Sequence, residues 1–258
     1  MNTLIKKYSL LILLALLSIQ VSWGQPKAVK DSLVAANTIY SAAKYTDCIR
    51  KYQYVLSQGY ESMEIYYNLG NAFYKTGNAT YAILNYERAK KFAPNDEDIL
   101  YNLDLARTQV VDNIIQLPEP GFVRWWQEFI TSRSINFWGI CSLITFFTFL
   151  SLFGLFLLSG KFQVKRMAFW ISIGAISVSA ITFAIGASQQ SKLIRHNTAV
   201  ITAPSVKVKA SPSDTGTDLF IVHEGITVKL TDELGEWVNV SLPDGNKGWL
   251  KESSMVRI

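Results

Sequence analysis

The sequence predicts a multidomain protein with three parts: an all-α repeat domain, a hairpin of two transmembrane helices, and a small all-β domain at the C-terminus. Apolar residues first recur at spacings of three and four, as on one face of a helix. Two long apolar stretches without any charge follow, at 135–159 and 167–187. From residue 198 onward the pattern changes to short alternating runs, which are typical of strands.

Composition excludes several classes of function. The chain has 258 residues, with 25 Lys+Arg, 20 Asp+Glu and no basic block, so we expect no nucleic-acid partner. Its only two histidines, His196 and His223, have no cysteine or acidic partner at metal-ligand spacing, so no metal site is expected. Cys48 and Cys141 lie in a helical repeat and an apolar stretch, so no disulfide is expected. Without a nucleotide-binding glycine motif or a nucleophile-base set, we expect neither a cofactor nor catalysis.

Residues 1–24 have the layout of a secretory signal peptide. A short basic start precedes an apolar run, and Ser22 and Gly24 supply the small residues that precede a cleavage site. Cleavage would leave Gln25 as the new N-terminus. The alternative is an uncleaved anchor, although the apolar run is short for a full membrane span.

Residues 63–96 form a helix-turn-helix unit with a period of about 34 residues. Gly70 and Ala82 are small enough to let the two helices approach closely, while large aromatic rings fill the space beside them. The unit resembles the tetratricopeptide (TPR) repeat family, and the alternative is an ordinary helical hairpin. The positions that define the repeat are Tyr66, Leu69, Gly70, Phe73, Ala82, Tyr86, Ala89 and Pro94.

Further copies of this unit flank it. Residues 29–62 form a weaker repeat, in which Cys48 takes the place of Ala82 and is interpreted as a small packing residue. Residues 97–117 resemble only the first helix of a third repeat and are predicted to cap the array. The TPR domain is therefore predicted over 25–117.

The concave face of the repeats is the predicted site for a protein partner. In many TPR proteins an asparagine at the sixth repeat position contacts the backbone of a bound peptide, and Asn68 and Asn102 match that position. The alternative is that these side chains form a solvated polar face. The candidate partner-binding residues are Asn68, Asn71, Tyr74, Lys75 and Asn102.

A linker at 118–134 separates the repeats from the first apolar stretch. Its prolines break the helical pattern, and Trp125, Trp126 and Phe129 follow. Tryptophans just before a span usually sit at the level of the lipid headgroups, so we predict an interfacial amphipathic segment. The alternative is an aromatic contact with the repeat domain.

The two apolar stretches, 135–159 and 167–187, are each long enough to cross a hydrocarbon core of about 30 Å. The loop at 160–166 contains three basic residues, which predicts that it lies in the cytoplasm. Both soluble domains would then be periplasmic, as the signal peptide also predicts, in a multi-pass protein of the inner (cytoplasmic) membrane. Three small residues are predicted to let the spans pack closely: Gly174, Ser177 and Ser179.

After a polar linker at 188–197, residues 198–258 are predicted to form about five strands. Their pattern is similar to that of bacterial SH3-type (SH3b) domains. Related modules often bind cell-wall peptide or a protein segment, so Trp237 and Trp249 are candidates for a ligand groove; the alternative is that both are core residues. The matching features are Val206-Lys207-Val208, His223-Glu224-Gly225, Gly235-Glu236-Trp237, Asp244-Gly245 and Gly248-Trp249.

The order of these parts resembles the BatE group of the Bat (Bacteroides aerotolerance) family. The resemblance implies a membrane-anchored periplasmic component of a complex with von Willebrand A-type Bat proteins and a MoxR-type ATPase, linked to stress or oxygen tolerance. We therefore expect a scaffold or adaptor whose partners are membrane proteins and the lipid bilayer. The alternative is a cell-envelope sensor or anchor whose SH3b domain binds peptidoglycan.

Overall fold

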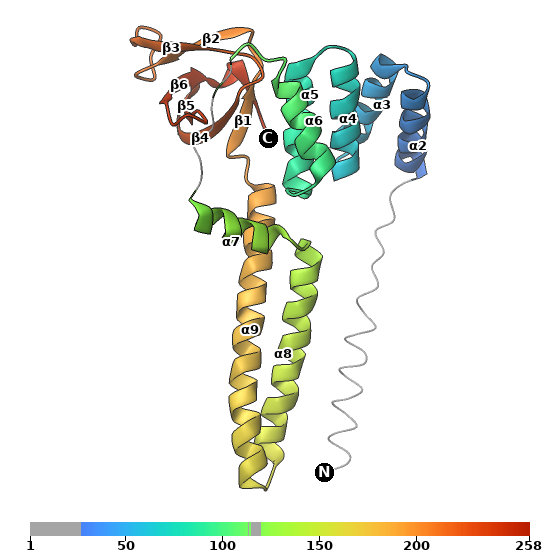
Figure 1. Ribbon diagram of the computed structural model, residues 1–258, viewed down its shortest axis with the longest axis vertical. Coiled ribbons are helices and arrows are strands. Elements are labelled where there is room, and N and C mark those ends of the chain that lie inside the picture. Colours follow the sequence, from blue (N-terminus) through green and yellow to red (C-terminus); the bar gives the residue numbers. More distant parts are fainter. Residues whose placement is uncertain (1–26, 113, 115–119) are drawn as a thin grey trace. The chain divides into compact units, whose positions relative to one another are not determined.

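A computed structural model describes residues 27–112, 114 and 120–258 (Figure 1). The predicted signal peptide at 1–24 lies outside the described residues. The chain divides into two compact units, Met1–Tyr60 and Glu61–Ile258. Each unit is described by itself below.

The first unit contains a helix pair, α2 (Lys27–Ser41) and α3 (Tyr45–Ser57). A tight turn joins the two helices, with Ala43 at a φ of 58°. Cys48 is fully buried on α3, and its Sγ donates to the carbonyl of Ala36 at 3.5 Å. The small thiol thus packs between the two helices.

The second unit begins with three helices, α4 (Met63–Lys75), α5 (Ala79–Phe92) and α6 (Glu97–Arg107). Each starts at a polar side chain that accepts a hydrogen bond from a backbone N–H of the first turn, which satisfies a group the helix itself leaves unpaired. These capping residues are Ser62, Asn78 and Asp96.

Close packing joins α4 to α5. A Cβ added at Gly70 would lie 2.7 Å from the ring of Tyr86, so glycine is needed for this approach. Ala82 is fully buried, and Phe73 stacks on Tyr81 with ring centroids 5.3 Å apart.

Helix α6 is shorter than the helix predicted over 97–117, since it ends at Arg107. The backbone N–H groups of Gln109 and Val110 bond to carbonyls only three residues back, which tightens the chain into a turn. The turn places Val110 against the sheet described below, where it packs on the buried apolar cluster. The chain therefore packs against the sheet at Val110 instead of continuing as helix α6.

Three further helices follow, α7 (Gly121–Thr131), α8 (Ile135–Leu158) and α9 (Phe162–Ile194). Helices α8 and α9 run antiparallel, side by side, and both are long and apolar enough to span a membrane (Figure 1). The predicted second stretch, 167–187, lies within the longer α9, because most of the basic loop at 160–166 forms the first turn of that helix. Within that turn, the Lys165 ammonium lies 5.1 Å from the ring centroid of Phe156 on α8.

Ser142 and Ser179 form the polar contact between α8 and α9. Each hydroxyl donates to the backbone carbonyl of the other residue, at 3.1 and 3.0 Å. The prediction of close packing at Gly174 and Ser177 is wrong: Gly174 has no atom within 4 Å of an added Cβ, and the exposed Ser177 bonds to its own helix. Both fall off the three-and-four spacing of the buried positions of α9, which are Ala168, Ser172, Ser179, Thr182, Ile185 and Gly186.

The C-terminal part is an antiparallel sheet whose seven described strands have the order β3-β2-β6-β5-β4-β1-β7. The sequence pattern predicts about five strands; β1 and β7 have only four and three residues, too few to show an alternating pattern. The strands are β1 (Thr198–Ile201), β2 (Ser205–Lys209), β3 (Asp218–His223), β4 (Thr227–Leu234), β5 (Trp237–Ser241), β6 (Lys247–Lys251) and β7 (Met255–Arg257).

One face of the sheet encloses an apolar core of branched side chains, which pack well on a pleated surface. Alternation along β5 turns Val238 and Val240 into this core and turns Trp237 to the other face. Val110, which follows α6, packs against the same core from outside the sheet. The core residues are Ala199, Ile201, Val208, Val222, Ile226, Val228, Val238, Val240, Leu242, Leu250 and Met255.

Candidate partner-binding surface

A hydrogen-bonded network of amide and phenol groups joins α4 to α6. Asn102 donates from its amide to the hydroxyl of Tyr67 at 2.8 Å and to Oδ1 of Asn71 at 3.2 Å. The hydroxyl of Tyr86 donates to the same Oδ1 at 2.7 Å. The structure therefore brings together Asn71 and Asn102, two of the predicted partner-binding residues.

Tyr67 belongs to this network, although it is not among the predicted partner-binding residues. It lies four residues before Asn71 on α4, so the two side chains share a helix face. That spacing is a signal that the sequence does contain. Its ring also lies beside that of Tyr86, with centroids 6.0 Å apart.

The other predicted residues of this face differ in how accessible they are. Asn68 is half-buried and Lys75 is exposed, and neither makes a side-chain hydrogen bond or ion pair with another described residue. Tyr74 is half-buried, and Tyr101 on α6 is 70% exposed. We call this set the α4–α6 surface: Tyr67, Asn68, Asn71, Tyr74, Lys75, Tyr101 and Asn102.

The sheet contacts the helices through several segments. One of them is the His223-Glu224-Gly225 segment of the predicted SH3b pattern, which consists of the last residue of β3 and the two residues after it. Glu224 accepts a 2.7 Å hydrogen bond from the hydroxyl of the buried Thr80 on α5. Gly225, at a φ of +90°, lies so close to Val110 that an added Cβ would be 2.6 Å from its side chain.

His223 closes this contact at the other end of the turn. Its backbone N–H lies 2.7 Å from one carboxylate oxygen of Asp112, and its ring Nδ1 lies 2.8 Å from the other. A carboxylate that accepts two hydrogen bonds in this way fixes both the backbone and the side chain of its partner. His223 therefore has a structural role where the chain leaves α6.

The C-terminus of the chain completes the contact between sheet and helices. Arg88 donates to the carbonyl of Arg257 at 3.1 Å, and Lys91 donates to the carbonyl of Ile258 at 3.3 Å. Burial lowers the pKa of the Lys91 amine. The carbonyls near it offset part of the cost of burying the charge.

An apolar cluster runs through the same contact. Val200 of β1 and the terminal Ile258 are both buried among side chains of α5 and α6. Such shared burial is the main stabilising force between packed elements. Helices α4–α6 and the sheet therefore behave as one packed body. The helical members of this cluster are Ala82, Ile83, Leu84, Tyr86, Leu103 and Ala106.

Short polar contacts attach this body to α7, α8 and α9. Asn95, in the corner between α5 and α6, donates to the hydroxyl of Thr131 at the end of α7 at 3.0 Å. Gln189 of α9 donates to the carbonyls of Ile130 and Arg133. Trp138 of α8 also donates to Ile130, at 3.1 Å, and so holds α7 on the helix pair.

Helix α7 presents aromatic rings outward, as the interfacial prediction requires. Phe122, Trp125, Trp126 and Phe129 are all exposed. Their described ring contacts are with one another and with Trp138 of α8, and none reaches α4–α6.

The two tryptophans of the sheet differ in exposure. Trp237 is 7% exposed, with the Lys251 ammonium 5.2 Å from the ring centroid, whereas Trp249 is half-buried. Both lie on the face opposite the apolar core, because Trp237 pairs with Lys251 and Trp249 pairs with Asn239 across β5 and β6. The two rings make no ring contact with each other among the described aromatic pairs. Trp249 is the better placed of the two for a ligand.

Within the described residues, no three His, Cys, Asp or Glu side chains lie close enough together to hold a metal ion. Comparison with protein-family models gave no match, and comparison with curated proteins gave none either.

Proposed function

We propose that this chain is a membrane-anchored scaffold or adaptor that binds a protein partner on the α4–α6 surface and catalyses no reaction. In this account α4–α6 belong to a TPR array, the sheet is an SH3b module, and α8 and α9 cross the membrane. The surface offers amides, phenols and one free ammonium, which suit a peptide segment. Such groups pair readily with the backbone N–H and C=O of an extended chain.

The observation that carries the proposal is the packing of the sheet against α5. Because Val200 and Ile258 share a core with the helices, the sheet covers one side of the helical body. In the α4–α6 surface of that same body, Lys75 and Tyr101 are exposed and the other members are half-buried. A packed support with a partly exposed polar and aromatic face suits the binding of a partner.

The long α9 supports the membrane placement. Its 33 residues extend for about 50 Å at about 1.5 Å per residue, whereas a hydrocarbon core is about 30 Å thick. The excess reaches beyond the bilayer and leads, after a three-residue connection, into β1. The basic residues Lys161, Lys165 and Arg166 at the other end of the helix favour the cytoplasmic side, which makes the soluble parts periplasmic and the protein a multi-pass component of the inner membrane.

The resemblance to the BatE group adds a partner class to this proposal. It suggests von Willebrand A-type membrane proteins within a complex that includes a MoxR-type ATPase, linked to stress or oxygen tolerance. Partners embedded in the same membrane would meet the α4–α6 surface without diffusing from solution. Tethering of this kind raises the effective concentration of the partner.

Affinity purification of the tagged full chain in mild detergent, with mass spectrometry, tests the proposal. Wild type should recover membrane proteins, and Asn68→Ala/Lys75→Glu should recover several-fold less. Lys247→Glu, an equal charge change at the exposed first residue of β6, should leave recovery unchanged. Asn102 is left intact because its bonds to Tyr67 and Asn71 support the fold.

Two outcomes would contradict the scaffold account. Equal recovery from all three proteins would exclude the α4–α6 surface as the binding site. Recovery of muropeptides without a protein partner, lost on Trp249→Ala, would favour the alternative of an envelope sensor whose sheet binds peptidoglycan. The half-exposed ring of Trp249 is the feature that would stack on such a ligand.

A further inference from the structure

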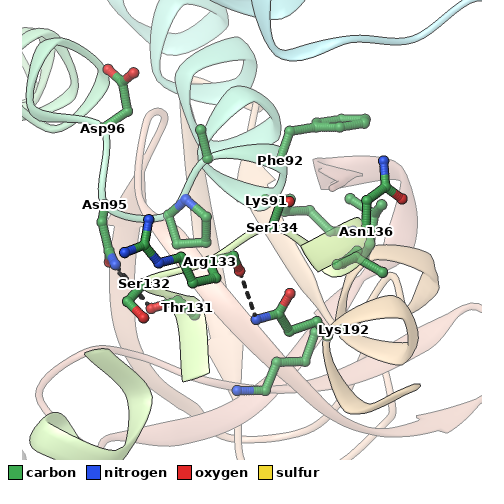
Figure 2. Close-up of a pocket in the computed structure, with 15 residues that line it drawn as sticks. Lys91, Phe92, Asn95, Asp96, Thr131, Ser132, Arg133, Ser134, Asn136 and Lys192 are labelled. Carbon is green, nitrogen blue, oxygen red and sulfur yellow. Dashed lines mark hydrogen bonds between the residues drawn. The ribbon is translucent and has the colours of Figure 1, made fainter. Parts of the chain in front are cut away.

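A cavity of about 530 Å³ lies where three segments of the second unit meet (Figure 2). One wall comes from the end of α5 and the corner after it, at 91–96. A second comes from the elbow between α7 and α8, at 131–136. The third comes from the last turns of α9, through Gln189, Lys192 and Leu193. We call this the elbow cavity.

Hydrogen bonds between the walls hold the elbow cavity open. Asn95 bonds to Thr131 at 3.0 Å and Gln189 bonds to the carbonyl of Arg133 at 3.3 Å, the two dashed contacts of Figure 2. Ser134 caps α8 by accepting a hydrogen bond from the N–H of Phe137. A cavity braced from all three sides is preformed, so a ligand does not have to order it on binding.

The charge of the cavity is positive. Its lining contains Lys91, Arg133 and Lys192 against a single carboxylate, Asp96, which already accepts the N–H of Ile99 as the cap of α6. Lys91 is engaged with the carbonyls of Arg195 and Ile258. Arg133 and Lys192 are exposed, and neither forms an ion pair with any described residue. The Arg133 guanidinium lies 5.6 Å from the ring centroid of Phe137, a contact that does not neutralise its charge. Both cations therefore lack an anionic partner among the described residues and can contact an anionic ligand.

The remaining lining contains both apolar and hydrogen-bonding side chains. Ile135, the first residue of α8, leads from the cavity onto the apolar surface of that helix, and Leu193 lies opposite on α9. Ser132 and Asn136 add a hydroxyl and an amide at the rim. An occupant that satisfies this lining has an anionic head and a hydrocarbon tail.

We propose that the elbow cavity binds the phosphate headgroup of an anionic phospholipid. Arg133 and Lys192 contact the phosphate, and Asn136 contacts the glycerol region. Ile135 directs the first part of an acyl chain along α8. The inference rests on the membrane placement of α8 and α9 proposed above, because only that placement brings the cavity to the level of the headgroups. It requires no protein partner.

Lipid titration by native mass spectrometry of the purified full chain tests this site. The probes are phosphatidylglycerol, phosphatidylcholine, and soluble glycerol phosphate with inorganic phosphate. The test variant is Arg133→Gln/Lys192→Gln. The matched control is Lys165→Gln/Arg166→Gln, which removes the same charge at the opposite end of the helix pair.

Wild type and the control should retain phosphatidylglycerol in preference to phosphatidylcholine. The test variant should bind phosphatidylglycerol about tenfold more weakly, or worse, because each basic residue near an anionic surface contributes substantially to binding. The two variants should have similar melting temperatures, close to that of wild type, because each loses one cation–π contact and no ion pair: Arg133 with Phe137 in the test variant, and Lys165 with Phe156 in the control.

If both variants lose phosphatidylglycerol binding equally, the proposal is overturned, because basic residues anywhere near the membrane surface would then explain the binding. If wild type binds phosphatidylcholine as tightly as phosphatidylglycerol, the charge of the headgroup is not the basis of binding. Soluble phosphates that bind as tightly as the lipid would make the ligand a free anion. Liposome flotation, measured in parallel, reports membrane placement alone. If the protein does not float with liposomes, the proposed function is contradicted. If it floats but shows no headgroup preference, only the lipid-site inference is contradicted.

Discussion

Thr80 on α5 and Glu224 in the turn between β3 and β4 are joined by a 2.7 Å hydrogen bond, although 144 positions separate them in the chain. The hydroxyl of Thr80 is the donor, and its residue is buried. Ala82 and Ile83, which follow Thr80 closely on α5, belong to the apolar cluster that Val200 and Ile258 share with the helices. The bond is thus a specific marker of the packing that unites the helices and the sheet.

Removing this bond should loosen the sheet from the helices. Thr80→Val keeps the shape but deletes the donor, and Glu224→Ala deletes the acceptor. A double-mutant cycle from thermal unfolding should give a coupling free energy of about 1 kcal/mol, since the bond involves a charged group that is partly exposed. Thr76→Val, whose exposed hydroxyl bonds only within α4, is the control. Strict additivity of the two changes would show that the bond does not stabilise the contact.

Gly70→Ala should destabilise the protein, although alanine ordinarily favours a helix over glycine by about 1 kcal/mol. The added Cβ would lie 2.7 Å from the Tyr86 ring, and overpacking of this kind costs about 1–3 kcal/mol. Gly174→Ala on α9, where no atom lies within 4 Å, should be neutral or slightly stabilising. Melting temperatures compare the two. A rise for Gly70→Ala would contradict the close packing of α4 on α5.

Cys48 should resist thiol reagents in the folded protein. Burial raises the pKa of its thiol to about 11, and the side chain is fully enclosed, so almost no accessible thiolate exists at pH 8. The measurement is the labelling rate in a Cys141→Ser background, with and without denaturant. Denaturant should accelerate labelling by orders of magnitude. Fast labelling of the native protein would mean that α2 does not cover Cys48.

The sheet should lose a small part of its stability in acid through Asp218. Hydrogen bonds from Lys207 and Lys209 lower the pKa of this carboxyl below its ordinary value of 3.8. A lowered folded-state pKa stabilises the protein above the unfolded-state pKa, and that contribution disappears as the pH falls through the folded-state value. The melting-temperature difference between wild type and Asp218→Asn should therefore be larger at pH 7 than at pH 3, and smaller in high salt. If the melting-temperature difference is the same at pH 7 and pH 3, Asp218 does not stabilise the sheet through its charge.

The sequence predicted the features that depend on local pattern. The coarse division into helices, two long apolar helices and a C-terminal sheet is confirmed, because periodicity and absence of charge are visible along the chain. Features that depend on distant contacts could not be predicted. The end of α6 at Arg107 follows from packing of Val110 on the sheet, and β1 is too short to show a pattern.

In the candidate site, too, the sequence indicates which residues lie on a helix but not which distant residues they contact. Asn71 and Asn102 were found from their positions on predicted helices, but their mutual bond and the part of Tyr67 in it require the geometry of α4 against α6. The His223-Glu224-Gly225 segment is part of the SH3b-like sequence pattern. Its contact with the segment after α6 could not be deduced from that pattern, because Asp112 lies 111 positions away in the chain.

The most direct test of the account is site-specific photo-crosslinking in cells. A benzophenone amino acid would replace Tyr101, which is 70% exposed beside Asn102, or Leu234, which is 60% exposed on the sheet. The account predicts that the probe at position 101 forms a discrete adduct with a membrane protein, and that the adduct weakens with Asn68→Ala/Lys75→Glu. No protein adduct at position 101, together with capture of cell-wall fragments at position 234, would contradict the assignment of the α4–α6 surface as the partner site.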